Sequence, residues 1–151
     1  MARTVLALVV EVVLTILVAV GLGTLLQWLL GVVGVGGVVG GGTGGLTAAA
    51  GEAARQLVFF MDIGLAVWVV ILIVVAVRGR ALPSIGVTLL AAVIGVVVNA
   101  LTVLVVSLVQ GGGTTEFLTY AIEAGVAFLV AVLIVAPIIR RLFRAPVNSA
   151  T

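Results

Sequence analysis

The chain has 151 residues, of which 64% are hydrophobic and only 8% are charged. About a quarter of the residues of an ordinary soluble domain are charged, so a chain this apolar could not cover its own surface in water. It contains no Cys and no His, which excludes disulfides, structural zinc, haem held by His or Cys and a Ser–His nucleophilic pair. The composition therefore predicts an integral membrane protein that is not an enzyme and needs no metal or cofactor.

Four long apolar runs cover residues 5–30, 57–77, 85–109 and 117–139. Each is long enough to cross the hydrocarbon core, which takes about 20 helical residues. The runs are rich in Val but do not alternate with polar residues, as strands of a membrane barrel must, so they indicate helices. We expect an all-α, four-helix membrane bundle formed by one domain, residues 1–151.

The glycine-rich connection after the first run covers residues 31–56 and is predicted to lie outside the membrane. Nine of the fifteen residues from 31 to 45 are Gly, which is typical of a flexible linker. The alternative is a surface that lets another backbone approach closely, as small residues do between membrane helices. Residues 47–56 are richer in Ala, so we expect the second helix to begin before it enters the membrane.

The arginines predict the orientation of the chain. In a four-pass arrangement only Arg55 lies on one side, and six arginines lie on the other: Arg3, Arg78, Arg80, Arg140, Arg141 and Arg144. The positive-inside rule then places both termini in the cytoplasm, in the plasma or inner membrane of a cell. The use of Arg without Lys in a chain rich in Val, Gly and Ala is typical of a prokaryotic protein from a GC-rich genome.

Two further features of the sequence leave alternatives open. The first apolar run follows Met1, Ala2 and Arg3 and is therefore similar to a signal peptide, whose cleavage would leave three spans. A shift of 61 residues places Leu57–Val75 on Leu118–Ala136 with seven identities, and Asp62 then falls on Glu123. If this repeat is a duplication, the bundle consists of two tandem helical hairpins.

Small and polar residues recur at helical spacing and predict the faces that pack in lipid, because close packing and hydrogen bonds drive association there. On the first helix they are Glu11, Thr15, Ala19, Gly23 and Gln27, and on the third they include Thr88, Gly95 and Thr102. These faces favour a homo-oligomer or a subunit of a larger membrane complex. Lipids are the expected anionic neighbours, and nucleic acid is not, since the arginines are not gathered on one polar face.

Asp62, Glu123 and Asn99 form the candidate ion or proton site. Both acids lie about 8–9 Å below the start of their helices, and Asn99 reaches a similar depth on the third helix. A charge inside the bilayer is costly, so these groups face protein or water or are protonated. They are either a proton or cation site, or polar groups that hold the helices together.

Two functions are therefore predicted from the sequence. The first is a structural or accessory role that works through helix packing and oligomerisation. The second is a small proton- or cation-coupled transporter or channel in which Asp62 and Glu123 titrate.

Overall fold

The computed structural model describes residues 2–33, 45–111 and 114–143, and within these ranges every regular element is an α-helix. In chain order the helices are α1 (Ala2–Val33), α2 (Gly45–Phe60), α3 (Asp62–Gly79), α4 (Ile85–Gln110) and α5 (Thr114–Leu142). Of the connection predicted at residues 31–56, residues 34–44 lie outside the described residues; residues 31–33 belong to α1 and residues 45–56 to α2.

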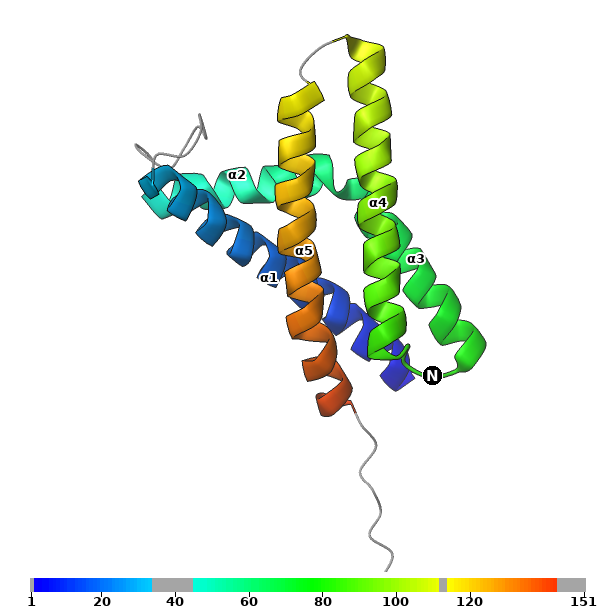
Figure 1. Cartoon of the computed structure of the whole chain (residues 1–151). Coiled ribbons are helices and arrows are strands. Elements are labelled where there is room, and N and C mark those ends of the chain that lie inside the picture. Colours follow the sequence, from blue (N-terminus) through cyan, green and yellow to red (C-terminus); the bar gives the residue numbers. More distant parts are fainter. Residues whose placement is uncertain (1, 34–44, 112–113, 144–151) are drawn as a thin grey trace, which may run out of the picture.

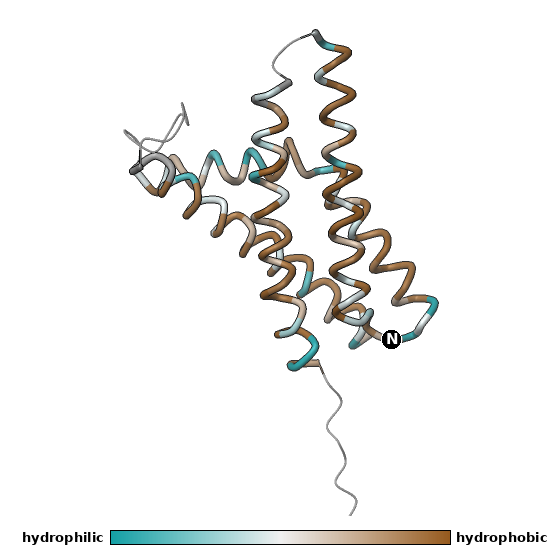
Figure 2. Tube along the Cα trace, viewed as in Figure 1, coloured by the Kyte–Doolittle hydropathy of each residue, from teal (hydrophilic) through white to brown (hydrophobic). Residues whose placement is uncertain are grey.

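Four helices are long and apolar enough to cross a membrane: Ala2–Leu29, Asp62–Gly79, Ile85–Gln110 and Phe117–Leu142. Figure 2 shows hydrophobic residues along almost the whole length of these helices, with hydrophilic ones gathered near their ends and along α2. The prediction of an all-helical chain with four apolar helices is thus confirmed. Four helices of this length and apolarity are typical of a multi-pass membrane protein.

The second apolar run is not one helix. Its first four residues end α2, Met61 leaves the helical conformation (φ −133°, ψ 7°), and α3 begins at Asp62. In Figure 1, α2 runs across α5, whereas α3 turns away from it and runs beside α4. We predicted a single helix from the outer connection into the membrane, and the break at Met61 instead makes α2 a fifth, separate helix.

The helices pack as two pairs joined through α5. Helix α1 crosses α5 obliquely and also contacts α2, while α3 packs on α4 and α4 on α5 (Figure 1). The beginning of α1, the turn between α3 and α4 and the last turn of α5 lie at one end of the molecule. These segments carry Arg3, Arg78, Arg80, Arg140 and Arg141, so five of the six arginines predicted to share a side lie at one end; Arg144 falls outside the described residues.

Small residues bring the helices close together. A Cβ atom on Gly95 would lie only 2.5 Å from the carbonyl oxygen of Gly64, so the backbones of α3 and α4 touch at this point. Likewise, a Cβ on Gly23 would lie 3.1 Å from Cβ of Ala53, where α1 meets α2. The small-residue faces that the sequence singled out on α1 and α4 are therefore used for packing within the chain.

Trp68 forms the centre of the apolar core. Its side chain is fully buried and meets the ring of Phe128 edge-on at 5.2 Å. Its indole nitrogen donates to the carbonyl oxygen of Thr88 at 3.3 Å, so the one polar atom of the ring has a partner. The contact ties α3 to both α4 and α5.

Helices α4 and α5 extend well past α2. Asn99 lies against the α2–α3 junction and Glu123 against α2, so residues 100–110 of α4 and 114–122 of α5 continue beyond that level. At about 1.5 Å per residue these extensions measure about 16 Å and about 13 Å. Figure 1 shows both helices projecting past α2. We call residues 100–110 and 117–122 the overhang.

Candidate functional site

Arg140 joins three parts of the chain at the arginine-rich end. Its guanidinium donates to Glu11 Oε2 at 2.8 Å, to Thr88 Oγ1 at 2.8 Å and to the carbonyl oxygen of Pro83 at 2.6 Å. The partners come from α1, α4 and the turn before α4. We call Glu11, Pro83, Thr88 and Arg140 the arginine cluster.

The arginine cluster is almost closed to solvent. The side chain of Arg140 is 12% exposed and that of Glu11 is 1% exposed. Removing two charges from water is costly, and the loss is offset only when the pair has good geometry and further hydrogen bonds. Arg140 has these bonds, but Glu11 Oε1 and the neighbouring Thr15 Oγ1 are buried without a hydrogen-bond partner. The ion pair between Glu11 and Arg140 bridges 129 positions of the chain.

A second polar group lies between α1, α2 and α5. Gln27 Nε2 donates to Gln56 Oε1 and to Glu123 Oε2, both at 3.0 Å. We call these three residues the amide cluster. They border a cavity of about 10 Å³, room for about one water molecule. Gln56 Nε2 is buried there without a hydrogen-bond partner, so the cluster retains an unused donor beside an acid.

Asn99 explains the break between α2 and α3. In an unbroken helix the amide of Gly64 would donate to the carbonyl of Phe60, four residues earlier. Here Asn99 Oδ1 accepts from Gly64 N at 3.2 Å, and Asn99 Nδ2 donates to the oxygen of Phe60. One side chain from α4 thus replaces one bond of the helical ladder. Insertion of a side chain into that ladder is a known cause of sharp kinks.

Asp62 lies beside this junction and is exposed. Its carboxylate accepts from the amide of Ile63 at 2.7 Å, in the first turn of α3, where a negative charge is favourable. Asp62 and Asn99 border the same cavity, of about 250 Å³, together with Phe60, Thr102 and further residues of the overhang. The hydroxyl of Thr102 donates to the carbonyl of Val98 in its own helix.

The three residues of the predicted ion site therefore fall into two neighbouring groups at the level of α2. Asp62 and Asn99 share the larger cavity, whereas Glu123 belongs to the amide cluster. Of the residues predicted to pack, the structure buries Glu11, Thr15, Ala19, Gln27, Thr88 and Gly95, and it half-buries Gly23 and Thr102.

Sequence reasoning missed Arg140 and Gln56. Arg140 follows a 23-residue apolar run and precedes another arginine, so it was counted as a flanking charge. Pro137 favours an end of the helix nearby, yet α5 continues to Leu142 and carries Arg140 with it. Gln56 stands directly before the second apolar run and was assigned to the outer connection.

Among the residues that the structure describes, no group of three or more His, Cys, Asp or Glu side chains could hold a metal ion. The chain matches no protein-family model, and no curated protein or solved structure shows significant similarity to it.

Proposed function

We propose that this chain is a non-enzymatic, structural or accessory protein of the plasma or inner membrane, with both termini in the cytoplasm, which assembles with itself or with a larger complex. The arginines at one end support this orientation through the positive-inside rule. The overhang is the observation that carries the proposed assembly role.

The outward face of the overhang is apolar and lacks a covering helix within the described chain. Val105, Leu108 and Val109 are 58%, 64% and 81% exposed. They lie beyond the level of α2, whose outer side bears Glu52 and Arg55, 3.9 Å apart. A charged pair favours the membrane surface, and a bilayer that has its surface at α2 leaves the overhang outside the hydrocarbon. A partner helix packed on the overhang removes this conflict, since exposed apolar patches of this kind mark interaction sites.

The natural absence of Cys makes this proposal directly testable. Single Val105→Cys and Leu90→Cys variants would be labelled in native membranes with a short thiol-reactive photo-cross-linker and irradiated. Both positions are on α4 and are similarly exposed, at 58% and 61%, but only Val105 is in the overhang. We expect Val105→Cys to yield a discrete adduct, either a dimer or a heavier partner, and Leu90→Cys to yield far less. Equal yields at the two positions would remove the basis for a packing role.

Transport of protons or cations is the second candidate function, with Asp62 and Glu123 as the titrating groups. The amide cluster favours it, because Glu123 lies beside a water-sized cavity and an unused buried donor. The break at Met61 also favours it, since discontinuous membrane helices commonly form substrate sites in transporters. An acidic side chain inside a membrane costs free energy, so such residues are rare and often have a function.

Flux into proteoliposomes separates the two functions. Wild-type protein would be compared with the Asp62→Asn/Glu123→Gln double variant and with Glu52→Gln, which removes an acid of α2 outside both groups. Transport predicts a proton or cation flux that the double variant abolishes and Glu52→Gln retains. If the folded wild-type protein gave no flux, transport would be excluded and the packing role would be the remaining candidate.

A further inference from the structure

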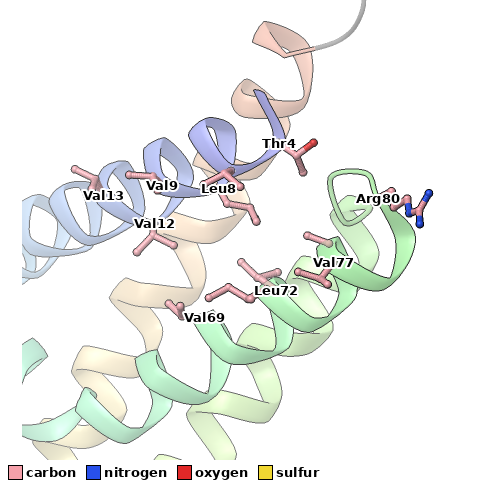
Figure 3. Close-up of a pocket in the computed structure, with 12 residues that line it drawn as sticks. Thr4, Leu8, Val9, Val12, Val13, Val69, Leu72, Val77 and Arg80 are labelled. Carbon is pink, nitrogen blue, oxygen red and sulfur yellow. The ribbon is translucent and has the colours of Figure 1, made fainter. Parts of the chain in front are cut away.

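A groove between α1 and α3 opens near the arginine-rich end and is lined almost entirely by apolar side chains. It has a volume of about 380 Å³, and ten of its twelve lining residues are apolar. In Figure 3, Leu8 and Val12 on α1 face Val69 and Leu72 on α3 across it. Each of these helices packs mainly on other helices, α1 on α5 and α2 and α3 on α4, so side chains fill little of the space between them.

The two polar lining residues lie together at one end of the groove. They are Thr4, in the first turn of α1, and Arg80, which follows α3 (Figure 3). Arg80 is exposed. One end of the groove is thus basic and hydroxylated, and the rest is apolar.

The dimensions match one leaflet of a bilayer. From Val69 to Arg80 the α3 wall advances by eleven residue steps, which is about 16 Å. Half of a hydrocarbon core about 30 Å thick is about 15 Å. A molecule that fits such a site has one long apolar chain, about a leaflet deep, and an anionic group at the membrane surface.

We propose that the groove between α1 and α3 binds one anionic phospholipid of the cytoplasmic leaflet, with an acyl chain against Leu8, Val12, Val69 and Leu72 and its phosphate beside Arg80. The positive charge of Arg80 at the rim of the groove selects an anionic headgroup, because basic side chains at the cytoplasmic surface attract anionic lipids. A helix of a second copy fits this site less well. With its side chains it is about 10–12 Å wide, and the floor of the groove is closed by Leu8 and Leu72, which are 9% and 1% exposed.

Native mass spectrometry of the full chain in detergent tests the headgroup. The probes are phosphatidylglycerol and phosphatidylcholine with identical acyl chains. We expect one phosphatidylglycerol to bind in preference to phosphatidylcholine, and Arg80→Gln to reduce that preference about five-fold, the effect of one arginine near an anionic headgroup. Arg78→Gln is the matched control, since Arg78 does not line the groove. Equal effects of the two substitutions would overturn the assignment of the phosphate to Arg80.

A second pair of variants tests the acyl chain. Ile73 lines the groove and is 48% exposed, whereas Val70, on the same helix, is 57% exposed and does not line it. Ile73→Trp should fill the groove and abolish binding of the retained lipid, and Val70→Trp should leave it unchanged. Retention of the lipid by Ile73→Trp would refute the site. A dimer lost in Ile73→Trp but kept in Val70→Trp would show that a second copy occupies the groove, and would also refute it.

Discussion

Two side chains, the buried Glu11 and the largely buried Arg140, show how single residues join distant parts of this chain. They are 129 positions apart and meet at 2.8 Å inside the protein. The benefit of such a pair relative to apolar residues of similar size is small, because both charges have left water. The removal of one partner is a different matter, since the other charge then stays buried and unpaired.

We therefore expect Arg140→Leu to lower the free energy of unfolding by about 3–5 kcal/mol. The Glu11→Leu/Arg140→Leu double variant should recover most of this loss, because no buried charge remains. Reversible unfolding in mixed micelles would measure the free energy of unfolding of the wild type, of both single variants and of the double variant. If the double variant were as unstable as Arg140→Leu, the packing of the arginine side chain, and not its charge, would explain the loss.

At the scale of helices, the break between α2 and α3 depends on a residue of a third helix. Asn99 provides an acceptor for Gly64 and a donor for Phe60, so neither backbone group is left unpaired. This compensation matters because the amide of Gly64 is buried and would otherwise have no partner. The contact of Gly64 with Gly95 brings α4 close enough for Asn99 to reach both partners.

Asn99→Ala should lower the free energy of unfolding by about 1–3 kcal/mol, because it leaves the buried amide of Gly64 and the half-buried carbonyl of Phe60 without their partner. Thr102→Val, one turn further along the same helix, removes only a bond within α4 and should cost less. Chemical unfolding followed by circular dichroism would compare the two. Similar losses would mean that Asn99 does not hold the junction.

The sequence predicts the helices much better than their partners. Length and apolarity are properties of a segment, so four apolar helices follow from composition alone. The end of α2 at Phe60 does not, because it depends on Asn99, 39 positions away. The 61-residue spacing likewise pairs Glu123 with Asp62, yet Glu123 accepts a hydrogen bond from Gln27 on α1. Helical spacing predicts which face of a helix packs, but it does not predict which other helix that face contacts.

At the scale of the whole molecule, the distribution of arginines predicts the direction of insertion. An impermeant maleimide should label Ala81→Cys, in the turn between α3 and α4, only after the cytoplasmic side is opened. Thr115→Cys, at the opposite end, should be labelled in intact cells. Both residues are exposed, so accessibility within the protein does not bias the comparison. The reverse pattern would invert the topology and would place the groove between α1 and α3 in the outer leaflet.

The unequal lengths of α3 and α4 have a consequence for the surrounding lipid. With 18 residues α3 measures about 27 Å, and with 26 residues α4 measures about 39 Å. The first is shorter and the second longer than a typical hydrocarbon core of about 30 Å. Bilayers adapt to such mismatch by thinning beside a short helix and thickening beside a long one, at fractions of a kcal/mol per Å. Without a partner on the overhang, the bilayer would have to thicken beside α4 and thin beside α3, so the protein would form a step in membrane thickness. We expect the protein without its partner to gather at boundaries between thin and thick lipid domains, where one side of the step already matches each domain.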